Sequence, residues 1–183
     1  MADEYLFEVN VGERTPLNST IDLAPYDPDW PQQFSLYADR IRQALGEKVL
    51  LIEHVGSTSV PGLSAKPIID MVLAVTNSAD EPSNIPQLEA RGFVLRIREP
   101  DWFQHRLLKG PGPPGNLHVF SIGCEEIVRV LRFRDWLRTH EDDRQLYAQT
   151  KRELAARIWK FTQHYADAKS AVVQEILGRA LSR

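Results

Sequence analysis

The chain has 183 residues, of which 43% are hydrophobic and 26% charged, a composition typical of a soluble globular protein long enough to bury a core. A single cysteine, Cys124, excludes an internal disulfide framework and a multi-cysteine metal cluster. The formal net charge of −3 argues against a nucleic-acid binder that depends on bulk positive charge. Because the sequence shows neither a long apolar stretch nor a signal-peptide pattern, we expect a cytoplasmic protein that does not enter the membrane.

The first 20 residues lack a sustained periodicity and predict a loose N-terminal arm or an edge strand. Residues 21–183 predict a single domain, because no segment of linker composition divides them. Residues 21–23 predict a short strand. Apolar residues at helical spacing then predict a helix that begins after Asp29 and ends at Gly46.

Five apolar runs with turn residues between them predict strands at residues 49–55, 67–75, 93–97, 102–108 and 117–121. A short helix around Leu88, closed by Gly92, is predicted between the second and third strands. The last two strands form a hairpin in this interpretation, and its Gly/Pro-rich loop, 110–116, predicts a mobile tip.

Beyond Gly123 the apolar period changes from two residues to about 3.6, which predicts three helices, at residues 127–137, 146–158 and 165–181. Strands first and a helical C-terminal third predict an α+β or mixed α/β fold. Nine Lys or Arg residues face five acids between Arg129 and Lys160. This excess indicates either solvated helix faces or a cationic wall beside a phosphate-bearing ligand.

A turn and a lone acid mark the region around the first two strands. Gly56 and Ser57 interrupt the chain after the first strand, and Asp70 lies within the apolar run of the second. A buried, unpaired carboxylate costs on the order of several kcal/mol. We therefore expect a metal ion, a cation such as Lys66, or the solvent of a cleft beside Asp70.

Several short sequence motifs in and around this region resemble those of a known family. They are HVGST at 54–58, VPGL at 60–63, AKPIID at 65–70, YDP at 26–28, LHV at 117–119 and FRD at 133–135. Together with Tyr147 and Lys151 they extend over nearly the whole chain, from about residue 21 to about residue 178. In these motifs the chain resembles the GrpB family, which is assigned to the nucleotidyltransferase superfamily.

The resemblance implies a nucleotidyltransferase-like mixed sheet flanked by helices. In that superfamily a Gly-Ser element holds the triphosphate, and an Asp-x-Asp pair roughly a dozen residues later holds Mg²⁺ or Mn²⁺. Gly56-Ser57 and Asp70 match this pattern, but Val72 stands at the second carboxylate position. Valine has no oxygen to offer, so the usual two-metal site is incomplete.

His118 is the predicted residue to complete the site, so Asp70 and His118 are the predicted catalytic and metal-binding pair. A half-buried, hydrogen-bonded histidine is the alternative for His118. The predicted nucleotide- and phosphate-binding residues are His54, Gly56, Ser57, Thr58, Lys66, Arg134 and Lys151. Structural roles remain open for several of these: a hydrogen bond for His54, a helix cap for Ser57, a surface ion pair for Arg134, and packing for Lys151.

Two functions follow from these residues. The first is transfer of a nucleotidyl or phosphoryl group from a nucleoside triphosphate to a small-molecule acceptor, with a divalent metal ion. The second is a non-catalytic nucleotide- or phosphometabolite-binding module, which Val72 favours. Domains that resemble this family occur fused to dephospho-coenzyme A kinase, so the resemblance implies a link to coenzyme or nucleotide metabolism. We expect a phosphorylated small molecule as the partner and not a nucleic acid.

Overall fold

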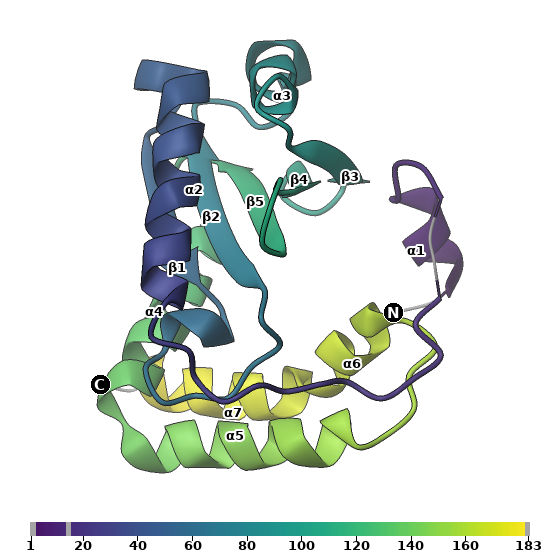
Figure 1. The fold of residues 1–183 in the computed structure, drawn as a ribbon, viewed down its shortest axis with the longest axis vertical. Helices are drawn as coiled ribbons and strands as arrows, with labels where there is room; N and C mark the ends of the chain where they lie inside the picture. Colours follow the sequence, from purple (N-terminus) through teal and green to yellow (C-terminus); the bar gives the residue numbers. More distant parts are fainter. Residues whose placement is uncertain (1–2, 14–15, 182–183) are drawn as a thin grey trace.

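A five-stranded mixed sheet forms the centre of the protein in a computed structural model, which describes residues 3–13 and 16–181 (Figure 1). In spatial order its strands are β1 (Leu51–Val55), β2 (Ile69–Val75), β5 (Gly115–Ser121), β4 (His105–Lys109) and β3 (Val94–Glu99). Strands β2 and β5 run parallel, and the other neighbouring strands are antiparallel. The hairpin predicted between the last two strands is therefore confirmed.

Helices surround this sheet and make up most of the C-terminal third. They are α1 (Asp3–Glu8), α2 (Trp30–Leu45), α3 (Glu81–Glu89), α4 (Glu125–Thr139), α5 (Glu141–Ala155), α6 (Thr162–Ala168) and α7 (Ser170–Leu181), with short 3-10 helices η1 (Gly46–Lys48) and η2 (Ser57–Ser59). Figure 1 shows α2 lying along the sheet, and α5 and α7 running across its lower end. This arrangement confirms the predicted mixed α+β class. In the part of the chain that is described, none of the helices combines the length and apolarity needed to cross a bilayer.

One face of the sheet packs against α2 and builds the main core. Helix α2 begins after Asp29 and ends at Gly46, as predicted, and it buries Trp30 and Ile41. Alternate residues of the two central strands meet these side chains because successive strand residues point to opposite faces. The strand residues of this core include Met71, Leu73, Val75, Leu117 and Val119.

The opposite face of the same strands is apolar at one end and polar at the other. Val72, Phe120 and Ile127 belong to an apolar cluster under α4. At the start of the parallel strands, the register pairs Asp70 with Asn116. Both of these side chains remain partly exposed, so the polar end of this face is where a ligand has access.

The N-terminal residues depart from the predicted arm. Residues 3–8 form α1, which buries Leu6, and Asn10 forms a bridge to Ile97 at the edge of β3. The strand predicted at 21–23 is instead an extended segment, in which the Ile21 amide bonds the Ala155 carbonyl of α5 (3.0 Å). A three-residue run offers too few ladder bonds for a strand, and helix α5 supplies the partner.

One prediction in the C-terminal half needs correction. The helix predicted over 165–181 is two helices, because the chain turns at Lys169, whose amide bonds the carbonyl three residues earlier at Ala166 (3.2 Å). The mobility predicted for the loop at 110–116 stays a prediction, and Tyr37 of α2 contacts this loop. The Tyr37 hydroxyl donates to the Pro113 carbonyl (2.5 Å), and its ring fills the space beside Gly110.

Candidate functional site

The turn after β1 lies directly against Asp70. Gly56 adopts φ +68° and ψ −171°, a backbone conformation that is essentially restricted to glycine. A Cβ atom at this position would lie 2.6 Å from Asp70 Oδ2, so any other residue would displace the carboxylate. Further along the loop, Val60 and Leu63 are buried against α4, α5 and α7, which fixes the turn in place.

A chain of hydrogen bonds connects Asp70 to the neighbouring strands. Asn116 Nδ2 donates to Asp70 Oδ1 (2.7 Å), and Lys109 Nζ donates to Asn116 Oδ1 (2.5 Å). Burial raises the pKa of the Asp70 carboxyl. The hydrogen bond from Asn116 and the charges of nearby lysines oppose this effect only in part, so the pKa of Asp70 stays above its usual value.

Four lysines from separate parts of the chain gather near this carboxylate, and we call them the lysine cluster. They are Lys66 before β2, Lys109 at the end of β4, Lys151 in α5 and Lys169 between α6 and α7. Burial lowers the pKa of each ammonium group, to about 8 for Lys66 and to about 7 for Lys151. The charge of Lys169 lowers the pKa of both of these lysines further.

The acids near the lysine cluster do not match its charge. Among residues 3–13 and 16–181, Asp70 is the one acid whose charge raises the pKa of Lys66, Lys109 and Lys169. None of the described acids raises the pKa of Lys151. Positive charge is therefore in excess at a partly buried position.

Lys151 is the most buried member of the cluster, with 2% of its surface exposed. Its Nζ donates to Ser57 Oγ (3.0 Å) and to the Ser64 carbonyl, and it lies 5.0 Å from the centre of the Tyr147 ring. Burial raises the pKa of Tyr147 to about 12, while a hydrogen bond with Ser57 acts in the opposite direction. Ser57, Tyr147 and Lys151 thus form a hydrogen-bonding group beside the carboxylate.

His54 and Thr58 hold the turn from its other side. His54 Nε2 lies 2.9 Å from Thr58 Oγ1, and the Thr58 hydroxyl donates to the Ile68 carbonyl (3.1 Å). Because the hydroxyl proton is used in that bond, we assign the proton of the His54 ring to Nε2. Burial lowers the pKa of His54 to about 4, so this ring is neutral near pH 7.

Arg134 belongs to a second set of charges, on α4, that we call the arginine network. Its guanidinium donates to Glu53 Oε2 (2.7 Å), to Asp135 Oδ1 (2.7 Å) and to the His54 carbonyl (2.9 Å). These bonds tie α4 to β1, and Arg138 adds bonds to the Ser59 carbonyl (3.0 and 2.8 Å). The phosphate-binding role of Arg134 stays a prediction, and Arg134 is not part of the lysine cluster.

His118 lies two register positions further along the sheet than Asn116, the partner of Asp70, and it pairs with Val72. Its Nδ1 lies 3.0 Å from His105 Nε2, and His105 Nδ1 lies 2.6 Å from Glu99 Oε2. Burial lowers the pKa of His118 to about 3. The Glu99 carboxylate accepts a hydrogen bond from His105 Nδ1, so Glu99, His105 and His118 form a continuous chain of polar side chains.

The groups around Asp70 do not suit a resident Mg²⁺ or Mn²⁺ ion. Such ions bind mainly to carboxylate oxygens, carbonyl oxygens and water. Here Asp70 is surrounded by an amide donor and ammonium groups, and Val72 at the second carboxylate position is 1% exposed within an apolar cluster. Within the described residues, no group of three or more His, Cys, Asp or Glu side chains could hold a metal ion.

The structure brings together part of the predicted site and adds residues to it. Ser57, Lys66, Asp70 and Lys151 gather there with the Gly56 turn, and His54 and Thr58 support that turn from behind. The sequence-based prediction missed three residues: Lys109, Asn116 and Lys169. Parallel pairing of the second and fifth strands was the signal that would have placed Asn116 beside Asp70.

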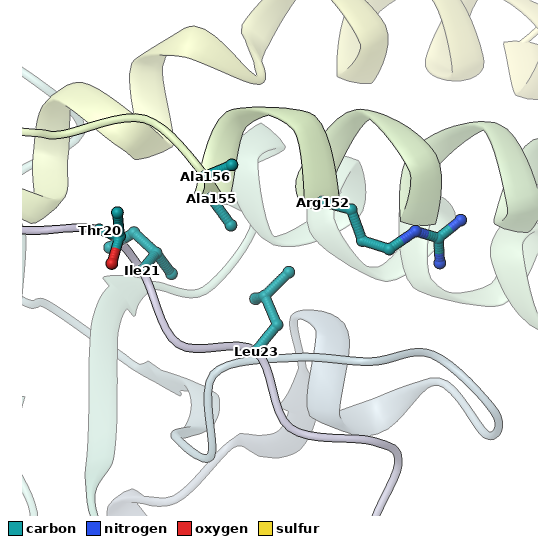
Figure 2. A pocket seen from close by; sticks show the side chains of 6 residues that line it. All are labelled: Thr20, Ile21, Leu23, Arg152, Ala155 and Ala156. Carbon is teal, nitrogen blue, oxygen red and sulfur yellow. The ribbon is translucent and has the colours of Figure 1, made fainter.

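A separate hollow lies between the N-terminal segment and the end of α5 (Figure 2). Its lining is mostly aliphatic and consists of Thr20, Ile21, Leu23, Arg152, Ala155 and Ala156. Figure 2 shows Leu23 pointing toward α5, with the Arg152 side chain running along that helix. This lining contains neither an acid nor a histidine, so the chemistry of the protein is better sought at the lysine cluster.

Comparisons with known proteins agree with the resemblance noted in the sequence. The GrpB protein family matches residues 20–179. A UPF0157 protein of Halalkalibacterium halodurans is 61% identical over 178 residues, which cover 97% of this chain and 91% of that protein. The crystal structure of the conserved protein GrpB from Enterococcus faecalis has a TM-score of 0.73 and 31% identity, over 88% of this chain and 98% of that chain. A dephospho-CoA kinase of Mycolicibacterium paratuberculosis is 31% identical over 177 residues, 82% of this chain but 44% of that protein.

Proposed function

This chain belongs to the GrpB family, and we propose that its lysine cluster binds the phosphate groups of a nucleotide or of another phosphorylated small molecule. The observation that carries the proposal is the excess of positive charge beside Asp70. Burying ammonium groups without matching acids costs free energy that a polyanion would recover on binding. Linked phosphate groups supply several negative charges within a small volume.

Hydrogen-bonding groups adjoin these charges and suit phosphate oxygens. Lys151 and Ser57 each offer donors next to the Gly56 turn, and Asn116 orients the Asp70 carboxylate by a hydrogen bond. Lysine recognises phosphate as a point charge, so a cluster of lysines tolerates several arrangements of a flexible oligophosphate. This favours a ligand with two or more linked phosphate groups over a single phosphate.

Binding without group transfer is the function that these contacts support best. Val72 supplies no second carboxylate, and the donors around Asp70 do not suit a metal pair. Transfer of a nucleotidyl or phosphoryl group to a small-molecule acceptor is the second candidate. It is favoured by the position of Gly56 directly against Asp70, which agrees with the Gly-Ser element that the resemblance to nucleotidyltransferases implies.

A coenzyme precursor is one specific ligand worth testing. Relatives of this chain include a protein named dephospho-CoA kinase, of which the matched part is less than half. Dephospho-coenzyme A contains a pyrophosphate group, which fits the ligand chemistry proposed for the lysine cluster. We therefore include this compound, together with nucleoside triphosphates, among the candidate ligands.

The test is a thermal-shift screen with ATP, UTP, inorganic tripolyphosphate and dephospho-coenzyme A, with adenosine as the uncharged control. A ligand that binds the folded state raises Tm, whereas adenosine should not. Lys66→Met should weaken binding roughly tenfold because it removes one charge from the cluster. Lys48→Met is the matched control, since Lys48 bonds the Ser83 carbonyl outside the cluster.

Release of pyrophosphate or phosphate from ATP and UTP is measured in parallel, in the presence of candidate acceptors. Stabilisation without release supports the binding module, and release that Lys66→Met reduces supports the transferase. If no phosphorylated compound raises Tm, or if Lys48→Met weakens binding as much as Lys66→Met, the proposal is wrong.

A further inference from the structure

The metal dependence of this site can be inferred from its charges, on the premise that the proposed function holds. A carboxylate that serves as a metal ligand needs oxygen partners and free access for the ion. Asp70 Oδ1 accepts the Asn116 amide, and Oδ2 lies against the backbone of Gly56. Both oxygens therefore already have neighbours supplied by the protein.

The lysine cluster presents the opposite environment to a cation. Lys66, Lys109 and Lys169 all act electrostatically on Asp70, and each would repel a divalent ion placed beside that carboxylate. The same three ammonium groups would attract the oxygens of a linked phosphate chain. In the nucleotidyltransferase superfamily Mg²⁺ neutralises the charge of the phosphates. Here the lysine side chains can neutralise that charge.

Asp70 then has a different task from the one its motif predicts. In the absence of ligand it is the one described acid that offsets the charge of Lys66, Lys109 and Lys169. Its contacts with Gly56 and Asn116 hold the carboxyl group in place beside these lysines. A bound polyanion would compete with this carboxylate for the same ammonium groups.

We propose that the lysine cluster binds oligophosphate without a divalent metal ion, and that Asp70 is the internal counter-charge of the cluster and not a metal ligand. This inference and the metal-dependent alternative predict opposite effects on ligand affinity when the charge of Asp70 is removed. Removing the charge of a metal ligand abolishes binding, whereas removing a competing counter-charge strengthens it. Ser57 and Lys151, which bond each other at 3.0 Å, contribute donors in either case.

The experiment measures the Kd of inorganic tripolyphosphate by calorimetry, for the full chain in EDTA and in excess MgCl₂ or MnCl₂. We expect binding in EDTA to be at least as tight as with metal, because Mg²⁺ would neutralise phosphate oxygens that the lysines need. Asp70→Asn, which keeps the side-chain shape, should bind tripolyphosphate roughly threefold to tenfold more tightly than the natural sequence.

Two controls separate the outcomes. Glu125→Gln removes one negative charge from the exposed first turn of α4, which follows the end of β5 opposite to Asn116, and should change the Kd by less than about twofold, because screening weakens distant charges. Circular dichroism and Tm establish that each variant is folded, and the comparison of EDTA with metal needs no variant at all.

Binding that requires metal and disappears in Asp70→Asn would overturn this inference while leaving the proposed phosphate site intact. Failure of the unaltered protein to bind tripolyphosphate under either condition, together with no binding of any nucleotide, would overturn the proposed function as well. Tighter binding in Asp70→Asn, independent of metal, supports both.

Discussion

Two charged clusters flank the turn at residues 56–59, and they differ in how their charges are matched. In the arginine network, the Arg134 guanidinium meets the carboxylates of Glu53 and Asp135 and a main-chain carbonyl. In the lysine cluster, Lys66, Lys109 and Lys169 act electrostatically on the single carboxylate of Asp70, and no described acid raises the pKa of Lys151. In the arginine network the positive charge is neutralised by carboxylates of the protein, as a purely structural role requires. The unmatched cluster indicates a place where something outside the protein supplies the missing charge.

Breaking the arginine network should produce the largest effect on stability. Arg134→Met removes a buried charge and should lower the free energy of unfolding by about 3 kcal/mol. The loss is moderated because the side chains of Glu53 and Asp135 are 39% and 57% exposed and can hydrate. Urea unfolding measures this change, and the Kd for tripolyphosphate should stay the same within about twofold.

Arg132→Ala is the matched control for that prediction, because Arg132 is an exposed arginine of the same helix. It should change stability by about 0.5 kcal/mol or less. Equal losses in the two variants would mean that the network on α4 contributes nothing specific, and the contrast between the two clusters would disappear.

Replacing the glycine that separates the two clusters should have the next largest effect. Gly56→Ala forces a Cβ to within 2.6 Å of Asp70 Oδ2 and places alanine in a backbone region that excludes it, so we expect a loss of about 2 kcal/mol. Gly62→Ala, at φ +78° with open space around its Cβ position, should cost about 1 kcal/mol. The Kd for tripolyphosphate should change in Gly56→Ala alone, because only this variant displaces the carboxylate that competes for the lysines. Equal effects in both would show that Gly56 has no particular relation to the carboxylate.

A smaller effect, of about 1 kcal/mol, is expected from pH. The pKa of Lys151 is about 7 in the folded protein and near 10.5 in the unfolded chain, so between these values the unfolded chain binds more protons. Raising the pH from about 7.5 to about 8.5 should therefore increase the stability of the ligand-free protein. Urea unfolding at several pH values measures this trend, and saturating tripolyphosphate should flatten it by favouring the charged lysines.

Lys151→Met provides the check, since it removes the titrating group while keeping most of its apolar stem. Its stability should depend less on pH over the same window. A natural protein whose stability falls as the pH rises through this window would contradict the view that the lysine cluster carries surplus charge.

Local sequence patterns were sufficient for most of the fold. Apolar spacing predicted α2 and its end at Gly46, and the five strands fall at the predicted places. The exceptions depend on tertiary partners. The segment at 21–23 pairs with the end of α5, and the helix predicted over 165–181 is interrupted at Lys169, where no proline or glycine marks the turn. Neither feature has a local signal.

The candidate site was predictable only where one contiguous motif encodes it. Gly56, Ser57, Lys66 and Asp70 lie within 15 positions of one another, and the sequence reading found all of them. Asn116 joins them through the register of two parallel strands that are separated by 39 residues, from 76 to 114. A register of this kind depends on which strands become neighbours, and strand order is determined by the packing of the whole sheet and not by local sequence.

The contact between Tyr37 and the β4–β5 loop links α2 to both ends of that hairpin loop. The phenol ring occupies the space beside Gly110 and Gly115. These glycines are the sequence neighbours of Lys109 and Asn116. Any fluctuation that withdraws the ring would free the two ends of the hairpin together, and with them both groups that reach the carboxylate. The Gly110 amide bonds the Gly115 carbonyl at 3.0 Å. Binding of a ligand at the lysine cluster should therefore slow hydrogen exchange of the Gly110 amide.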